Sequence, residues 1–392
     1  MGSSGSSLWV VGSNTHGQLG LPKQSHTPNQ HKHSSPNAQS IPTIRAAEIP
    51  QCVESRDTAT QVAAGETHTA ALLDNGTILT WGSSSFGKLG HRIYNTNDLN
   101  EQESSNAYEQ EVPQLVHFPP RLFGHTPLVF LQVSCGQAHT AAIASDGTVY
   151  TWGSNLNGRL GRETHHEVEE RTPGRVQVSS GFSSISCGAC HTAACSMNNG
   201  RCFTWGLGMS GRLGHGNERD QRVPVVVENL KSMQTHRCAA GGHHTLVMVS
   251  SSEQPLPTVY SFGGGSFGKL GQGTIMSSSV PLEIISLSPS ALTAVEQTCQ
   301  DKMWGRNSSS SNSNNNNNNN NNNSGGGGGG EGETTTGILD WVVWISAGAH
   351  HCCAVTRLGA MYTWGQGNQG RLGHGNNDDV HVPRSISSFM TK

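Results

Sequence analysis

The sequence predicts an all-β protein, namely a β-propeller built from four-stranded antiparallel blades. Three observations lead to this fold class. Glycine accounts for 49 of 392 residues, against roughly 7% in an average protein. Of these glycines, 27 occupy fixed positions in two short motifs, which recur in the same order along the chain, and in the turns between them. Between the motifs lie short runs rich in β-branched and aromatic residues, which is the pattern of a blade repeated around a ring.

The first motif, here called the tail motif, is Gly, four residues, Gly, any residue, Leu, Gly. Its leading glycines are spaced by 70, 71, 53, 57 and 102 residues, so the basic unit has about 53 residues and three intervals carry insertions. An aromatic residue precedes the first glycine in five copies. The six copies are Gly12–Gly20, Gly82–Gly90, Gly153–Gly161, Gly206–Gly214, Gly263–Gly271 and Gly365–Gly373.

The second motif, here called the head motif, is Gly-x-x-His, and it lies upstream of five tail motifs. We expect its glycine and histidine, with the aromatic and the glycines of the tail, to be structural. These positions are Gly65, His68, Trp81, Gly82, Gly90, Gly136, His139, Trp152, Gly161, Gly188, His191, Trp205, Gly214, Gly241, His244, Gly271, Gly348, His351, Trp364 and Gly373.

Each unit contains four strand signals in order. In the first complete unit, residues 60–64 precede the head, residues 68–73 follow it, and Asn75-Gly76 is a hairpin turn before residues 77–81. A fourth strand follows each tail and contains a proline, which suits an edge strand because no ladder hydrogen bond is lost there. These prolines are Pro113, Pro173, Pro224, Pro281 and Pro383.

The repeats resemble those of the regulator of chromosome condensation family. The head at 133–140 and the tail at 150–161 carry the resemblance, which extends over nearly the whole chain. It implies a β-propeller, with seven blades in the usual form. It implies less about activity, because the family includes a guanine-nucleotide exchange factor for a Ran-type small GTPase, ubiquitin-ligase subunits, cilium-associated scaffolds and a plant photoreceptor.

Six tails and five heads predict about six blades, the last one incomplete, with the two termini meeting near one blade. A truncated gene product is the alternative explanation of this count. We expect a flexible N-terminus at residues 1–7 and a single propeller domain at 8–392. Three insertions, at 26–40, 93–111 and 305–337, interrupt it, and the third is Asn- and Gly-rich and is expected to be disordered.

No cofactor, metal or catalytic site is predicted. Cys187-Gly-Ala-Cys190-His191 matches the pattern that attaches c-type haem, but Gly188 and His191 are the ordinary head residues. The five head histidines should lie around a ring, too far apart to bind one metal. We expect each imidazole to be buried and to hydrogen-bond the backbone of its own blade.

The variable tail position before Leu carries a cation in five of six copies, namely Lys88, Arg159, Arg212, Lys269 and Arg371. On a ring these charges would share one face, where they could attract an acidic partner. The alternative is that each side chain lies along its blade with its charged head in solvent or paired with a local carboxylate. The residues two positions earlier differ between repeats, as partner-contacting loops would. They include Phe86 and Phe267, which we add to the partner-binding hypothesis.

The sequence predicts a protein-interaction scaffold that presents variable loops on a propeller, in a monomeric chain. The alternative is guanine-nucleotide exchange on a Ran-type or other small GTPase, and chromatin association is less favoured. The net charge of -3 and the absence of a basic tail argue against direct nucleic-acid binding. Ten cysteines without a secretory signal, and no apolar run long enough to span a membrane, predict an intracellular protein, cytoplasmic or nuclear, with free thiols.

Overall fold

The computed structural model describes residues 8–13, 40–47, 57–91, 109–119, 128–293 and 339–386. The predicted flexible N-terminus at 1–7 and the Asn/Gly-rich insertion at 305–337 lie outside these residues. So do the other two predicted insertions except at their ends. One strand begins at Ser40 and another at Glu109, so each of these two insertions ends slightly earlier than the sequence indicated.

Five four-stranded antiparallel sheets, here called blades I to V, form the described part of the chain, together with one two-stranded sheet. Blade I contains β3 (Ala59–Ala64), β4 (His68–Leu73), β5 (Ile78–Ser83) and β6 (Glu109–Leu115). Blade II contains β7 (Phe130–Cys135), β8 (His139–Ala144), β9 (Val149–Ser154) and β10 (Glu169–Arg175). Blade III contains β11 (Phe182–Cys187), β12 (His191–Ser196), β13 (Cys202–Gly206) and β14 (Gln221–Val226).

The remaining strands follow the same plan. Blade IV contains β15 (Gln234–Ala240), β16 (His244–Ser250), β17 (Thr258–Gly263) and β18 (Ser278–Glu283). Blade V contains β19 (Val342–Ala347), β20 (His351–Thr356), β21 (Met361–Gly365) and β22 (Val380–Ser385). The two-stranded sheet pairs β1 (Leu8–Ser13) with β2 (Ser40–Ala47).

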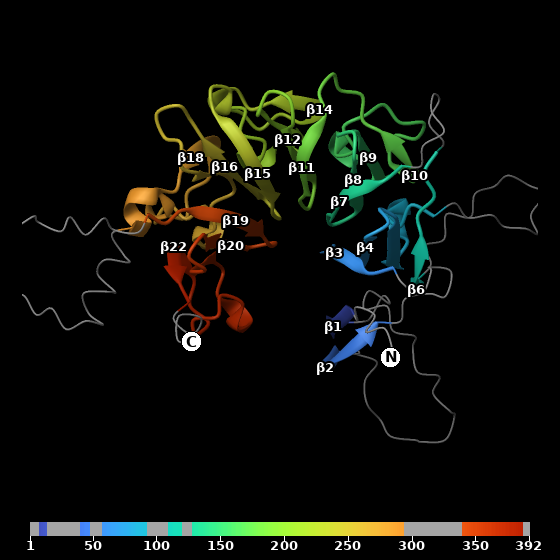
Figure 1. Cartoon of the computed structure of the whole chain (residues 1–392), viewed down its shortest axis with the longest axis horizontal. Coiled ribbons are helices and arrows are strands. Elements are labelled where there is room, and N and C mark those ends of the chain that lie inside the picture. The colour runs from blue at the N-terminus through green and yellow to red at the C-terminus, as the bar shows by residue number, and fades with distance from the viewer. Residues whose placement is uncertain are drawn as a thin grey trace, which may run out of the picture.

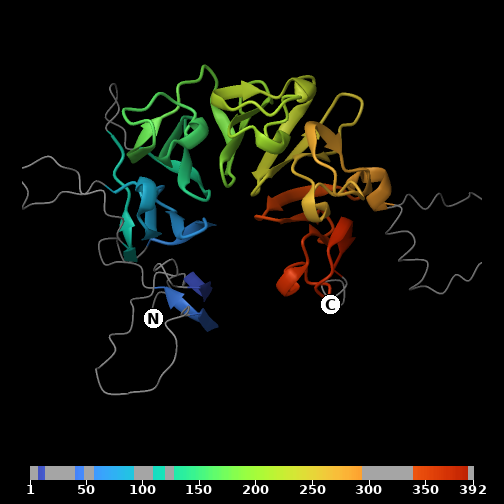
Figure 2. The same ribbon diagram turned by 180° about the vertical axis from the view of Figure 1, so that it is seen from behind.

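The blades lie side by side along an arc, with β7, β11 and β15 toward its inside (Figure 1). Figure 2 shows the same arc from behind, with the β1–β2 pair at one end and blade V at the other. The predicted propeller is confirmed, and its count of about six blades corresponds to five complete blades and the β1–β2 pair. The expected meeting of the termini at one blade is not seen among the described residues, because no strand of blade V pairs with β1 or β2.

The local signals in the sequence explain each blade. Gly76 has φ +80° in the hairpin between β4 and β5, a conformation that costs glycine little. The side chain of Asn75 supports the same turn by accepting a hydrogen bond from the backbone N–H of Thr77 at 2.9 Å. All five predicted prolines lie on outer strands. The strand order within each blade is therefore the one that the sequence predicts.

The apolar core lies between neighbouring blades. The aromatic rings before the tail glycines are fully buried, and one core cluster combines Ala70 and Leu72 of blade I with Phe130, Tyr150 and Trp152 of blade II. Each blade thus buries its apolar face on the next blade, as repeat folds do. Fully burying an aromatic or aliphatic side chain contributes about 1.5–3 kcal/mol, so most of the stability of a blade depends on its neighbour.

A short chain of hydrogen bonds joins each blade to the next. His68 of blade I donates from Nε2 to the hydroxyl of Thr140 in blade II at 2.9 Å. Thr140 in turn donates to the carbonyl of Lys88 in blade I at 2.8 Å, and the indole of Trp152 donates to the same carbonyl at 2.9 Å. We call this arrangement the inter-blade hydrogen-bond chain. It satisfies four polar groups that burial would otherwise leave unpaired.

The chain recurs at the next three junctions. Between blades II and III it runs from His139 through Thr192 to the carbonyl of Arg159. Between III and IV it runs from His191 through Thr245 to the carbonyl of Arg212. Between IV and V it runs from His244 through the thiol of Cys352 to the carbonyl of Lys269. For His68, His139, His191 and His244, the expectation that the imidazole bonds the backbone of its own blade is wrong, since the partner is a side chain of the next blade.

The head glycines are required by these histidines. A Cβ on Gly136 would lie 2.6 Å from Cε1 of His139 and against the carbonyl oxygen of Gly188 in the next blade. The imidazole therefore packs on the bare backbone of its own head. Because the threonine hydroxyl gives its only proton to a carbonyl, it must accept from Nε2 of the histidine. Each ring therefore carries a proton on Nε2. Nδ1 is buried without a partner, so a second proton there would create an unpaired buried charge, and the ring is neutral.

Acid should destabilise the fold through these histidines. Burial, with a smaller contribution from nearby cations, lowers the pKa of His68 and of His191 from 6.5 to about 3, and holds the pKa of His139 and of His244 well below 6.5. The unfolded chain binds protons below its ordinary histidine pKa and the folded chain does not. Stability is therefore complete above about pH 6.5 and decreases below it, by about 1.4 kcal/mol per pH unit for each such histidine.

Urea unfolding at a series of pH values measures this slope. Replacing the exposed pair His165 and His166 with glutamine should leave it unchanged. A free energy of unfolding that is constant below neutral pH would contradict the assignment of neutral rings.

The threonine hydroxyl that links the imidazole to the tail carbonyl should contribute measurably to the free energy of unfolding. Thr192→Val keeps the shape of the side chain but leaves Nε2 of His139 without an acceptor. We therefore expect the free energy of unfolding to fall by about 1–3 kcal/mol. Cys352→Thr places at the IV–V junction the hydroxyl that the other junctions use, and should leave stability equal or higher. Denaturant unfolding of both variants checks the pair, and an unaffected Thr192→Val variant would show that the chain contributes only packing.

Candidate partner-binding face

The head and tail motifs come together on one side of the propeller. The head joins the first two strands of a blade, and the tail joins the last two, so both lie at the same ends of the strands. In blade I the N–H of Ser83 donates to the carbonyl of Thr67 at 2.8 Å, and blade II repeats this contact between Ser154 and Ala138. We call this side, formed by residues 65–67, 84–90 and their counterparts in the other blades, the loop face.

Each tail loop holds one residue in a left-handed conformation. The loops contain the 3₁₀ turns η1 (Ser85–Gly87), η2 (Leu156–Gly158), η3 (Met209–Gly211), η5 (Ser266–Gly268) and η7 (Asn368–Gly370). The middle residue of each turn has φ between +60° and +63°. These residues are Phe86, Asn157, Ser210, Phe267 and Gln369. Asn adopts this conformation readily, but a bulky aromatic does so at a cost of about 1–2 kcal/mol.

The two phenylalanines differ in their surroundings. The side chain of Phe86 is 42% exposed on the loop face of blade I. Phe267 is partly buried, and its ring meets the imidazole of His350 in blade V edge to face, with centroids 5.6 Å apart. Of the two aromatic residues in the partner-binding hypothesis, Phe86 is therefore the one that solvent reaches most freely.

The predicted cations turn inward between the loops. Lys88, Arg159, Arg212 and Lys269 are at most 4% exposed, and Arg371 is partly exposed. Arg159, for example, donates to the carbonyl of Leu156 in its own turn at 2.9 Å and to that of Ala189 in blade III at 3.2 Å. Burial lowers the pKa of these four cations. Their positive charge thus lies just below the loop face, and the hydrogen bonds run to carbonyls and neutral side chains such as Thr67, rather than to solvent or a local carboxylate.

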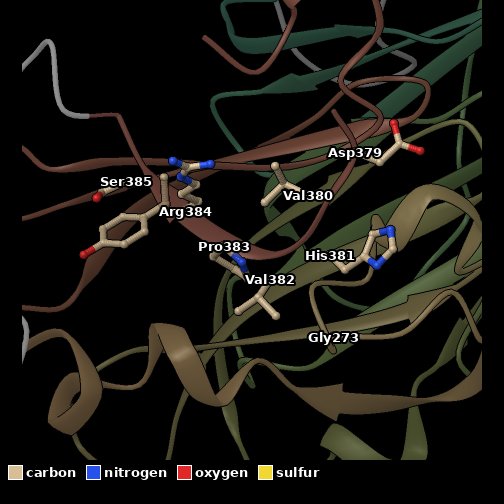
Figure 3. A pocket seen from close by; sticks show the side chains of 9 residues that line it. Gly273, Asp379, Val380, His381, Val382, Pro383, Arg384 and Ser385 are labelled. Atoms are coloured by element: carbon tan, nitrogen blue, oxygen red, sulfur yellow. The ribbon is translucent and has the colours of Figure 1, made fainter. Parts of the chain in front are cut away.

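The cysteines and a hollow on blade V are further candidate sites within the described ranges. No group of three or more His, Cys, Asp or Glu side chains in the described parts of the chain could hold a metal ion. Cys187 is buried, and burial raises the pKa of its thiol to about 12, while Cys190 is partly exposed. A shallow hollow runs along β22, lined by apolar Val380 and Val382 and charged Asp379 and Arg384 (Figure 3).

Sequence reasoning missed part of this arrangement. A threonine after four of the five head histidines was visible as a recurrent letter, but its partner, the head histidine of the preceding blade, was not, because the pairing joins residues more than 50 positions apart. The histidines before the head histidine, His243 and His350, carried no sequence signal, and the structure stacks their rings with centroids 6.4 Å apart. Among the helices described here, none is long and apolar enough to cross a membrane.

Comparison with known proteins agrees with the geometry. The family model for the RCC1-like domain matches residues 2–300, and models for the regulator of chromosome condensation repeat match residues 342–371 and 359–392. The ultraviolet-B receptor UVR8 of Arabidopsis thaliana is 27% identical over 341 residues, which cover 84% of this chain and 70% of the receptor. The human E3 ubiquitin-protein ligase HERC2 is 28% identical over 293 residues, which cover 70% of this chain and 6% of the ligase.

Solved structures give the same fold. Human WBSCR16 superposes with a TM-score of 0.65 at 20% identity, over 97% of this chain and 76% of that one. Yeast RCC1 (Prp20), solved bound to Kap60, superposes with a TM-score of 0.63 at 19% identity, over 98% of this chain and 71% of that one. The repeats, the inter-blade contacts and the matched family model together show that this chain belongs to the RCC1-like domain family of β-propellers.

Proposed function

We propose that this protein is an interaction scaffold that binds a protein partner on the loop face of its propeller. One observation carries the proposal. The fold repeats the same left-handed backbone position in five tail loops but places a different side chain on it in most of them. A constant backbone with variable side chains is the arrangement expected of a recognition surface on a rigid support.

The energetic cost at Phe86 supports the proposal. A glycine or asparagine at φ +61° would relieve the strain, yet the chain holds a phenylalanine there with 42% of its surface exposed. Strained residues that persist despite such a cost are concentrated at binding and catalytic sites. Exposed Leu156 and Met209 lie one residue earlier in the turn of the next two blades, at 44% and 49% exposure. The loop face therefore offers separate apolar contacts around a positively charged layer.

The relatives are consistent with a protein partner without naming it. The yeast Prp20 protein has been solved with Kap60, and a second structure of that protein was described with its binding to Gsp1p and histones. Those proteins are partners of Prp20. For this chain, the partner is proposed only as a protein, and guanine-nucleotide exchange is the rival function that a direct assay can separate.

Phe86→Gly should separate stability from binding. Because glycine adopts positive φ freely, the free energy of unfolding should stay the same or rise, within about 1 kcal/mol. Loss of the exposed ring should weaken capture of partners from a cell extract, measured by quantitative mass spectrometry against wild type. Met197→Ala removes a 50% exposed side chain from the hairpin between β12 and β13, on the opposite side, and serves as the matched control. Equal capture by all three proteins would contradict the proposal.

An exchange assay tests the rival function. A scaffold should not change the rate at which labelled GDP leaves small GTPases, Ran-type members included. Release should therefore follow the uncatalysed rate at all protein concentrations. Acceleration that rises with concentration and is lost in Phe86→Gly would replace the scaffold with an exchange factor that uses the same face.

A further inference from the structure

The junction of blades IV and V on the loop face gathers four basic groups, namely Arg212, His243, Lys269 and His350. Arg212 donates to Nδ1 of His243 at 2.8 Å, and the ring of His243 stacks on that of His350. The ammonium of Lys269 lies 6.0 Å from the ring centroid of Phe267, which in turn packs edge-on against His350. Both histidines are partly exposed, whereas Lys269 is buried beneath them.

The neighbouring blades place a carboxylate where blade IV has none. In blade III the N–H of Gly208, at the start of the tail turn, donates to the carboxylate of Asp220 at 2.9 Å. In blade V the N–H of Gly367 donates to the carboxylate of Asp379, also at 2.9 Å. In blade IV the equivalent N–H, that of Gly265, donates to the hydroxyl of Ser277 at 3.2 Å. Ser277 is exposed and neutral, so the tail loop of blade IV lacks the negative charge of the other two.

The electrostatic environment of the cations reflects this difference. The pKa of Arg212 is lowered by burial, and the carboxylates of Asp220 and Glu218 are among the groups that oppose the shift. The pKa of Lys269 is also lowered by burial, but the group that opposes it is the thiol of Cys352. A positive charge near the surface is therefore balanced by carboxylates in blade III and by none in blade IV.

Lys269 also has spare hydrogen-bonding capacity. An ammonium has three N–H donors, and the hydrogen bond made by this one runs to the carbonyl of Ser266 at 3.3 Å. In blade V the corresponding cation, Arg371, donates to the side-chain oxygen of Gln366 at 2.9 Å. Blade IV has Gly264 in place of that glutamine, and a Cβ there would lie 3.7 Å from Nζ of Lys269. Gly264 has no side chain, so it supplies no acceptor of the kind that Gln366 supplies to Arg371 in blade V.

An exposed apolar pair borders the same loop. Ile275 and Met276 are 61% and 73% exposed, and their carbonyl oxygens pack against Gly265 at the start of the tail turn. Side chains of this kind are enriched where a protein contacts another protein. The junction therefore combines uncompensated positive charge with an apolar surface beside it.

We propose that the IV–V junction binds an anionic side chain of an extended peptide, a carboxylate or a phosphate, while a neighbouring apolar residue of that peptide packs on Ile275 and Met276. The anion takes the place that Asp220 and Asp379 hold in the adjacent blades, and it contacts His243 and His350 above the charge of Lys269. This site specifies the kind of partner for the scaffold function proposed above and rests on that function.

Short fluorescein-labelled peptides test the site by fluorescence anisotropy. One peptide alternates glutamate with leucine, a second replaces glutamate with phosphoserine, and a third replaces it with glutamine. We expect the glutamate or the phosphoserine peptide to bind, more weakly as the salt concentration rises, and the glutamine peptide to bind at least about tenfold less tightly. Preference between the two anionic peptides identifies carboxylate or phosphate as the anion.

The decisive variant is Ser277→Asp, which copies the residue of blades III and V and so is compatible with the fold of the loop. Its carboxylate should occupy the site and reduce affinity at least about tenfold. Ser277→Asn adds a side chain of the same size without charge and should bind as the wild type does. Equal binding of the glutamate, phosphoserine and glutamine peptides, or wild-type affinity in Ser277→Asp, would overturn the proposal.

The two proposals can fail separately. If Phe86→Gly captures partners normally while Ser277→Asp loses the anionic peptides, the IV–V site stands and the role of the blade I loop fails. If Phe86→Gly loses its partners while Ser277→Asp still binds the anionic peptides, the role of the blade I loop stands and the IV–V site fails.

Discussion

The hydrogen-bond chain between blades is the constraint on which the rest of the structure depends. A buried imidazole without a partner would cost about as much as a lost core contact, and in this fold the partner comes from the next blade. Each head histidine therefore fixes the distance and rotation of its neighbour. The head glycine, the threonine and the tail carbonyl are all consequences, since each makes room for the imidazole or completes its bonding.

Because this constraint acts only where neighbouring blades meet, the side chains of the tail loops are free to differ between blades. The tail turns keep one backbone shape and carry residues as unlike as Phe86 and Ser210 at the same position. The acidic residue behind the turn is kept in blades III and V and replaced by Ser277 in blade IV. Functional differences between blades thus arise from single side chains, while the packing of the ring stays the same.

Much of the fold could be predicted from the sequence, because its signals are local. Glycines such as Gly76 mark turns, and prolines such as Pro113 mark outer strands, without reference to distant residues. The partner of His68 could not be predicted, because Thr140 is 72 residues away and the insertion between them hides the register. The burial of Arg212 could not be predicted either. A cation in a glycine-rich loop is expected to be exposed, and the head loop that covers this one belongs to the next blade. The site at the IV–V junction depends on comparing blades in space.

The carbonyl that ends each hydrogen-bond chain belongs to the residue whose side chain carries the cation, as in Lys88 and Arg159. One residue thus serves the architecture through its main chain and the loops through its side chain. Since every amino acid has the same carbonyl, this position can gain, lose or reverse charge without breaking the contact between blades. In the sequence, the first copy of the tail motif has Gln18 at this point of the motif. Related propellers can therefore diverge in the charge of this layer while their rings remain superimposable.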